Sequence, residues 1–287
     1  MEIAERVIEL SDGRKLAYAD WGDSEAPAVM YCHGFPTNLQ EIRLLTPALE
    51  RFGVNARLIV PNRPGYGASS PQPNRSFLDW PKDVAETADG LGIDRFAVLG
   101  VSGGSPYALA CGAALGERVT RIGIAVGVGP VEASGMETAQ AITGPSRFGI
   151  IRKIQFGMVA YAFKKGQEDR FFEQTLATMG DADREAMAHP DTRAWFLEMT
   201  RESLSQGGGP SAYEAGLYRK AWGFEPATIS TETLLRYGGL DTTVPASVGH
   251  WFAEQLPSAQ LRLMPEQGHF TWMLTEDAAG LITDLIR

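Results

Sequence analysis

Short apolar runs alternate with amphipathic stretches along the first 128 residues of the chain. Continuous or alternating apolar runs are typical of strands, and apolar side chains that return every three or four residues are typical of helices. Repeated alternation of the two favours a mostly parallel sheet with helices on both faces, which is an α/β fold. The pattern predicts strands at 6–10, 15–21, 28–32, 57–60, 96–101 and 119–126, and helices at 39–52, 78–91 and 105–115.

Residues 129–225 follow a different pattern, in which helical spacing dominates and no strand-like run interrupts it. After this region the alternation of strands and helices resumes. The sequence therefore predicts an α/β core formed by 1–128 and 226–287, with an all-helical insertion at 129–225. The predicted helices of the insertion include 150–164, 171–179, 192–205 and 213–222, and the later elements are strands 233–237 and 260–264 and helices 247–255 and 278–286.

A candidate nucleophile, Ser102, lies between a predicted strand and a predicted helix. It is the centre of the pentapeptide Gly100-Val101-Ser102-Gly103-Gly104. A strand that enters a helix through Gly-x-Ser-x-Gly forces the serine onto a sharp turn, where its Oγ projects from the sheet. Glycines are expected there because side chains would collide with neighbouring backbone. Because the chain has 32 glycines, the pentapeptide alone is weak evidence for a nucleophile. Its position between a predicted strand and a predicted helix strengthens that evidence.

A serine hydroxyl needs a base to take its proton, and the chain has four histidines. His269 follows a late strand, and a loop at that position can reach the nucleophile turn. We therefore expect His269 to be the base. His33 also follows a strand, and we expect it to brace its loop. His189 is expected at a helix end or on the surface, and His250 is expected to be structural.

The base in turn needs a carboxylate on its other ring nitrogen. Asp241 follows the strand 233–237 and is the predicted partner, although an aspartate there can also cap the next helix. Glu132, after the strand 119–126, is the alternative acid. The backbone N–H groups of Phe35 and Gly103 are predicted to form an oxyanion hole, because each lies just past a strand end.

Composition narrows the function classes. The net charge of 26 − 35 = −9 argues against a nucleic-acid backbone or an anionic membrane as partner. Cys32 and Cys111 lie in apolar segments and are expected to be buried, reduced thiols, too few for a zinc site. No metal-ligand cluster is visible, and we expect no cofactor. The first residues contain no apolar signal-peptide core, and no run approaches 18 apolar residues, so a cytoplasmic location is the expectation.

Five motifs follow one another along the chain, and among them the motif of the candidate nucleophile comes before that of the acid, which comes before that of the histidine. They are His33-Gly34-Phe35-Pro36, Arg63-Pro64-Gly65-Tyr66-Gly67, the pentapeptide around Ser102, Gly239-Leu240-Asp241 followed by Val244-Pro245, and Gly268-His269-Phe270.

On these motifs the chain resembles the α/β-hydrolase-fold family. The resemblance implies a Ser102–His269–Asp241 triad, an oxyanion hole at Phe35 and Gly103, and a helical cap at 129–225. Relatives often have aspartate where this chain has Asn62, and we expect that difference to affect loop bracing more than chemistry. A serine nucleophile in place of aspartate disfavours the epoxide hydrolases and haloalkane dehalogenases that share the fold.

Hydrolysis of a carboxylic ester or lactone is the leading function on these grounds, with a small-molecule substrate that has an apolar portion. The alternatives on the same fold are C–C bond hydrolases, prolyl aminopeptidases and cofactor-free haloperoxidases or dioxygenases. A non-catalytic ligand receptor is a further class, and the oligomeric state is left open. An aminopeptidase would need cap carboxylates to hold an amine, although such a charged run is usually a solvated helix face. The candidates are Glu168, Asp169, Glu173, Asp181, Asp183 and Glu185.

Overall fold

Eight strands form one sheet in the computed structural model of the protein, which describes residues 3–137 and 148–287. Their order across the sheet is β1-β2-β4-β3-β5-β6-β7-β8. The pairs β1–β2 and β2–β4 are antiparallel and all others are parallel, which confirms the predicted α/β fold with a mostly parallel sheet. The strands are β1 Arg6–Glu9, β2 Lys15–Trp21, β3 Ala28–Cys32, β4 Arg57–Pro61, β5 Phe96–Val101, β6 Val119–Ala125, β7 Thr233–Gly238 and β8 Ala259–Met264.

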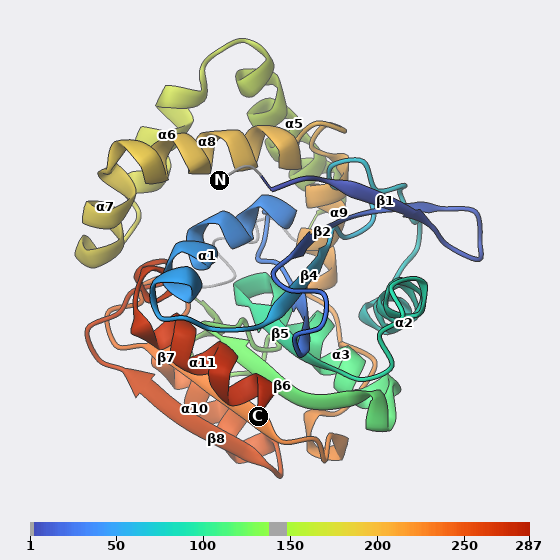
Figure 1. Cartoon of the computed structure of the whole chain (residues 1–287). Helices are drawn as coiled ribbons and strands as arrows, with labels where there is room; N and C mark the ends of the chain where they lie inside the picture. Colours follow the sequence, from blue (N-terminus) through green and yellow to red (C-terminus); the bar gives the residue numbers. More distant parts are fainter. Residues whose placement is uncertain (1–2, 138–147) are drawn as a thin grey trace.

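Helices cover both faces of this sheet (Figure 1). Each face has its own apolar core. Along β3, Val29 and Tyr31 join the core that includes α1 and α11, whereas Met30 and Cys32 join the core that includes α2, α3 and α10. A strand buried on both faces reads as a continuous apolar run, as this one does. The helices are α1 Ile42–Arg51, α2 Trp80–Gly90, α3 Ser105–Ala114, α10 Ala246–Gln255 and α11 Glu276–Ile286.

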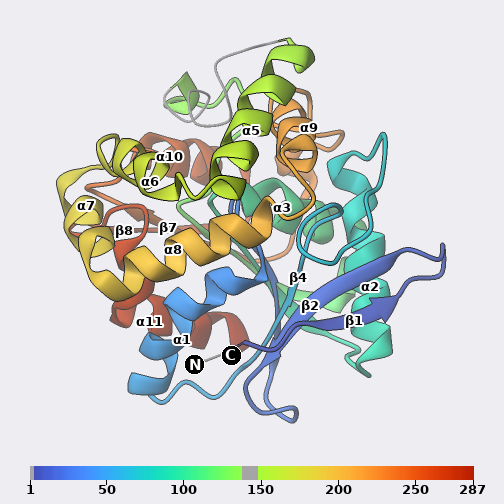
Figure 2. The same cartoon turned by 90° about the horizontal axis from the view of Figure 1, so that it is seen from above.

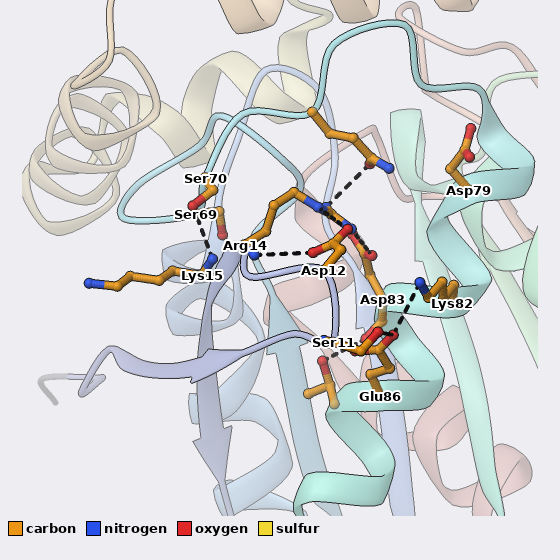
Figure 3. A network of polar contacts seen from close by, with 12 residues as sticks. Ser11, Asp12, Arg14, Lys15, Ser69, Ser70, Asp79, Lys82, Asp83 and Glu86 are labelled. Carbon is orange, nitrogen blue, oxygen red and sulfur yellow. Dashed lines mark hydrogen bonds and ion pairs between the residues drawn. The ribbon is translucent and has the colours of Figure 1, made fainter.

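The turn between β1 and β2 is fastened to α2 by a polar network (Figure 3). Arg14 and Asp83 form two hydrogen bonds of 2.8 and 2.5 Å, and Asp83 is almost completely buried. Ser11 donates to Glu86 from its backbone N–H and from its hydroxyl, at 2.6 and 2.7 Å. These contacts hold the antiparallel edge hairpin against the helix layer, so the edge strands do not rely on strand pairing alone.

Between β6 and β7, the described part of the chain contains the five α-helices α5 to α9, which group together along one side of the sheet (Figures 1 and 2). The described part of 129–225 contains no strand, as the sequence predicts. The division of the chain into core and cap domains stays a prediction. The five helices are α5 Gly149–Lys164, α6 Glu168–Leu176, α7 Asp181–Ala188, α8 Pro190–Ser203 and α9 Gly209–Leu217.

Two of these helices depart from the sequence prediction. Apolar spacing does not pick out α7, whose eight residues include few large apolar side chains, although its acidic residues fit a solvated helix face. The sequence also predicts the last insertion helix at 213–222, whereas α9 begins at Gly209. Pro210 occupies its first turn, where a missing backbone N–H costs no hydrogen bond, so the glycine-proline run starts this helix instead of preceding it.

Side-chain contacts join α8 to the first helices of the core. Trp195 Nε1 donates to the carbonyl oxygen of Gln40 at 2.9 Å, and Arg43 forms an ion pair of 2.7 Å with Glu198. Asn38 Nδ2 donates to the carbonyl oxygen of Met199 at 3.2 Å. The insertion is therefore packed against the core through specific polar contacts as well as through apolar side chains.

Two smaller expectations concern the cysteines and the membrane. Cys32 and Cys111 are buried, free thiols, as the sequence predicts, and Trp80 Nε1 donates to Cys32 Sγ at 3.3 Å. Among the helices of residues 3–137 and 148–287, none has the length and apolar character to cross a membrane.

Candidate active site

Ser102 lies on a strained turn between β5 and α3. The strand ends at Val101, and Ser102 opens a 3-10 turn with a φ of 50°, in the left-handed region that residues other than glycine rarely adopt. The glycines around it are required by close approach. A Cβ on Gly104 would overlap the carbonyl oxygen of Cys32, and a Cβ on Gly100 would lie 2.8 Å from Ala108 Cβ. The local sequence therefore produces the sharp turn expected of a serine presented as a nucleophile.

The structure brings the three side chains expected from the sequence together. Ser102 Oγ lies 2.9 Å from His269 Nε2, and His269 Nδ1 lies 2.8 Å from Asp241 Oδ2. The other oxygen of Asp241 accepts hydrogen bonds from the backbone N–H groups of Thr243 and Val244, at 2.7 and 2.8 Å. His269 and Asp241 are buried and Ser102 is partly exposed. A proton on Ser102 Oγ can therefore pass directly to an imidazole that a fixed carboxylate orients.

Nearby carboxylates raise the pKa of His269. Burial, the largest single effect, would lower this pKa because the charged imidazolium loses water, but the neighbouring carboxylates together outweigh burial, chiefly through the charge and the hydrogen bond of Asp241. Asp183 and Glu41 add further negative charge in the same direction. The imidazolium that forms when His269 accepts a proton is therefore stabilised.

The two expected oxyanion donors lie next to each other. A Cβ on Gly103 would stand 3.1 Å from the backbone nitrogen of Phe35 and 2.5 Å from its Cβ. The backbone hydrogen bonds of residues 3–137 and 148–287 include no acceptor for either N–H group. Two adjacent donors beside a nucleophile can stabilise a negatively charged oxygen, and each such donor is typically worth about 3 kcal/mol of transition-state stabilisation.

Arg63 holds the loop that contains Phe35. Its guanidinium donates to the carbonyl oxygens of His33 and Gly34, at 2.7 Å for the latter. Its Nε forms an ion pair of 2.6 Å with Glu214 of α9. Burial would raise the pKa of the Glu214 carboxyl, but the charges of Arg63 and Arg75, together with hydrogen bonds from two tyrosine hydroxyls, outweigh burial and lower that pKa. A fully buried cation is therefore matched by a carboxylate of α9.

His33 braces the same loop, as the sequence predicts. It is fully buried, and its Nε2 accepts a hydrogen bond from the Arg63 backbone N–H at 3.3 Å. Its Nδ1 lies 3.2 Å from Thr37 Oγ1. Burial and the neighbouring Arg63 charge hold the pKa of His33 well below its usual range, so the ring is neutral and acts as a hydrogen-bonding support.

The remaining candidates lie away from Ser102. His189 accepts a hydrogen bond from the Asp191 N–H at 3.4 Å as the N-cap of α8, which is the predicted helix-end position. His250 is exposed on α10. Glu132, the alternative acid, is exposed, whereas Asp241 contacts the histidine.

Asn62 joins two segments beside the candidate site. It is buried, and its Oδ1 accepts a hydrogen bond from the backbone N–H of Leu39 at 2.6 Å. Its own carbonyl oxygen accepts from Ser69 Oγ at 2.9 Å. The side-chain amide therefore joins the segment that follows β4 to Leu39, which follows the loop that contains Phe35.

Sequence reasoning missed the contacts of three side chains that the insertion places beside the site, those of Tyr218, Glu214 and Asp183. Tyr218 Oη lies 2.7 Å from the carbonyl oxygen of Gly103 and 2.9 Å from Glu214. Asp183, which the sequence suggests is part of a solvated helix face, is in fact almost completely buried against the loop of His269. Only tertiary packing selects these residues, and no local pattern distinguishes them from other tyrosines and acids.

Two observations bear on ligands. The described residues contain no group of three or more histidine, cysteine or acidic side chains that could hold a metal ion. Five surface clefts with volumes from 240 to 860 Å³ are lined by other parts of the chain and not by Ser102, Asp241 or His269. The space for a substrate is therefore not one of these surface clefts.

Comparison with known proteins agrees with this architecture. The family model described as alpha/beta hydrolase fold matches residues 27–274, which is most of the chain. The chain belongs to the alpha/beta hydrolase fold family. Hydrolysis of a small molecule is the class of reaction that this membership supports.

Individual members of the family differ in reaction. The chain is 26% identical over 291 residues to haloalkane dehalogenase 2 of Mycobacterium tuberculosis, covering 98% of this chain and 93% of that protein. It is 30% identical over 117 residues to an uncharacterised hydrolase of Saccharomyces cerevisiae. That match covers 40% of this chain and only 39% of the yeast protein. The structure of a thermophilic esterase from Thermogutta terrifontis superposes with a TM-score of 0.71 at 19% identity, covering 99% of this chain and all of that one, which shows a shared fold.

Proposed function

We propose that this alpha/beta hydrolase cleaves a carboxylic ester or lactone through an acyl-enzyme on Ser102. The observation that carries the proposal is the continuous relay from Ser102 Oγ to His269 at 2.9 Å and from His269 to Asp241 at 2.8 Å. A serine hydroxyl is a poor nucleophile without such a base. An aligned relay with a raised histidine pKa supports an enzyme over a receptor that only binds its ligand.

The reaction proceeds in two halves. Ser102 Oγ attacks the ester carbonyl while His269 Nε2 takes its proton, and the carbonyl oxygen becomes an oxyanion that the Phe35 and Gly103 N–H groups stabilise. His269 then gives the proton to the leaving alcohol as the carbon–oxygen bond breaks. Water next attacks the acyl-enzyme with His269 as base, and the acid is released with Ser102 restored. In a lactone the alcohol remains attached to the acyl group.

The chemistry of Ser102 also separates this proposal from dehalogenation. Attack of a serine oxygen on a saturated carbon that bears a halogen would give an ether. An ether has no carbonyl carbon for water to attack, so His269 and a water molecule could not restore Ser102. The similarity to a haloalkane dehalogenase therefore supports the fold and the family more than the reaction.

Two features of the cap bear on the substrate. The partly exposed Phe35 ring packs edge-on against Phe156 of α5 at 5.8 Å and Tyr218 at 5.4 Å, so an apolar acyl or alcohol group fits the surroundings of the oxyanion loop. Among the described residues of 129–225, the buried carboxylates are Asp183 and Glu214, and both are engaged by protein groups. Neither is free to hold the amine of an aminopeptidase substrate.

A fluorophosphonate probe tests the proposal without knowledge of the substrate. Intact-mass analysis should find one probe per wild-type chain and none on Ser102→Ala. Labelled wild type would then justify a screen of the untreated enzyme against esters, lactones, diketones and prolyl amides, with esters or lactones expected to be turned over. Absence of labelling on a folded wild-type chain, or labelling that persists in Ser102→Ala, would overturn the assignment of Ser102 as nucleophile.

A further inference from the structure

One cap carboxylate, Asp183, is bound by the backbone of the loop that contains the candidate base. Asp183 is the third residue of α7 and is only 1% exposed. Its Oδ2 accepts a hydrogen bond from the His269 N–H at 2.6 Å, and its Oδ1 accepts from the N–H groups of Phe270 and Thr271 at 2.8 and 3.2 Å. Three consecutive backbone donors therefore converge on one side chain from the insertion.

The close approach of this carboxylate explains the glycine before the histidine. A Cβ on Gly268 would lie 2.5 Å from both Cγ and Oδ1 of Asp183, a separation that real Cβ atoms do not adopt. Gly268 therefore leaves the room that Asp183 occupies. The glycine of the Gly-His pair is required by a contact with the cap, and its role is to admit the carboxylate.

The same end of α7 also reaches the loop that contains the acid. A Cβ on Gly180 would stand 3.2 Å from the carbonyl oxygen of Leu240 and 3.2 Å from the side chain of Thr242, the two neighbours of Asp241. The segment from Gly180 to Asp183 thus contacts the loop of Asp241 and the loop of His269 together. No other described segment of the insertion donates or accepts a hydrogen bond with the His269 loop.

We propose that Asp183 is a positioning residue for His269, through which the cap fixes the histidine loop so that the ring is aligned between Ser102 and Asp241. This inference rests on the proposed function of the site. Asp183 does not contact the reacting atoms. It acts through the backbone of residue 269, and a misplacement of a catalytic group by about 1 Å can reduce the rate about 10²-fold.

The charge of Asp183 gives the role a measurable signature. The charged groups facing His269 are Asp241 from the loop after β7, Asp183 from α7 and Glu41 from the start of α1. All three carboxylates favour the protonated imidazole, while burial opposes it. Loss of the Asp183 charge should therefore lower the pKa of His269. A lowered pKa would show that the charge of Asp183 reaches the ring, while a fall of kcat with KM nearly unchanged separates alignment of the ring from a merely structural role.

The test compares Asp183→Asn with Asp181→Asn in the full chain. Asp181 lies on the same turn of α7 and its side chain is 97% exposed, so it is a matched control. The amide introduced by Asp183→Asn would have one acceptor oxygen for three donors and would turn an N–H₂ group toward them. On an ester that wild type hydrolyses, kcat should fall about 10²-fold in Asp183→Asn with KM nearly unchanged, whereas Asp181→Asn should match wild type.

A second measurement needs no substrate. An NMR titration of the four histidine rings, with His269 assigned by its loss in His269→Gln, should give a lower pKa for His269 in Asp183→Asn than in wild type and Asp181→Asn. If Asp183→Asn does not fold, Gly268→Ala displaces the carboxylate from the other side and should reduce kcat in the same way. A folded Asp183→Asn with wild-type kcat and an unchanged His269 pKa would overturn the inference.

The outcomes separate the inference from the function on which it rests. Failure of wild type to react with the fluorophosphonate would reject the nucleophile assignment, while a lowered His269 pKa in Asp183→Asn would still support the contact between cap and histidine. Labelling of wild type with no change of pKa or kcat in Asp183→Asn would support the hydrolase and reject the positioning role.

Discussion

Arg63, which follows β4, and Glu214 of α9 form an ion pair of 2.6 Å in which both side chains are fully buried. The same guanidinium donates to the carbonyl oxygens of His33 and Gly34, directly before Phe35. The loop with one expected oxyanion donor is therefore held by a cation whose charge is balanced by a carboxylate of α9. Replacing either partner leaves an uncompensated buried charge, which is much more costly than losing an exposed pair.

Glu214→Ala should lower the free energy of unfolding by about 3–5 kcal/mol, because Arg63 would remain buried without its partner. The measurement is urea denaturation followed by circular dichroism. Glu198→Ala is the matched control, since Glu198 joins α8 to α1 through an ion pair of 2.7 Å with Arg43 but its side chain is 50% exposed. Loss of this exposed pair should cost at most about 1 kcal/mol. Equal losses in the two variants would contradict the prediction.

Ser102→Gly should be more stable than Ser102→Ala by about 1 kcal/mol, although both lack the nucleophile. The φ of 50° at this position is strained for alanine and relaxed for glycine. Thermal unfolding of both variants, which should be equally inactive, measures the difference. A more stable alanine variant would show that the turn relaxes to an ordinary backbone conformation once the serine is gone.

Asp241→Asn should reduce kcat by roughly 10³–10⁴-fold, because the amide no longer holds the imidazole in the tautomer that accepts a proton from Ser102. Steady-state kinetics on an ester that wild type cleaves provides the measurement. Glu132→Gln is the control and should match wild type, since Glu132 is exposed and His269 is hydrogen-bonded to Asp241. A near-normal Asp241→Asn together with an inactive Glu132→Gln would reverse the assignment of the acid.

The pH dependence of kcat/KM should follow the titration of His269. The protonated ring cannot accept the Ser102 proton, so the rate should rise with pH as the ring becomes neutral. Because the pKa of His269 is raised above its ordinary value of 6.5, the midpoint of this rise should lie above pH 6.5. A midpoint at or below that value would mean that the negative charge of Asp241 does not dominate the site.

The contact between Gly268 and Asp183 predicts a non-additive pair of substitutions. Gly268→Ala should reduce activity in the wild-type background, because the new methyl group would lie 2.5 Å from the Asp183 carboxyl. In an Asp183→Ala background the same change should have a much smaller effect, since the obstructing carboxyl is absent. A double-mutant cycle on kcat measures the coupling, and additive effects would argue against the contact.

Much of the fold follows from local pattern. Apolar runs such as 28–32 must be strands buried on both faces, and close backbone approach demands glycine at positions such as Gly100 and Gly104. These constraints act over a few residues, so the sequence contains them in readable form. The α/β alternation and the turn around Ser102 are therefore predictable from the sequence.

The contacts of the insertion with the candidate site could not be predicted from local patterns. Apolar spacing does not reveal α7, because a helix held by polar contacts needs few apolar side chains. Asp183 resembles any surface aspartate until the fold brings the backbone N–H groups of His269, Phe270 and Thr271 to it. Its hydrogen-bond donors lie 86 to 88 residues away in the chain, and no local sequence pattern reveals contacts over such a separation.

The hydrogen bonds from the histidine loop to Asp183 have a consequence for recombining parts of related proteins. Exchanging the insertion for that of a relative is an obvious way to change which substrates are accepted. In this chain such a graft would also remove the acceptor for three backbone donors around His269. A chimera that kept Ser102, Asp241 and His269 but lacked an acid at this position would leave the histidine loop without its acceptor. The junctions should therefore be chosen to retain the turn that begins α7.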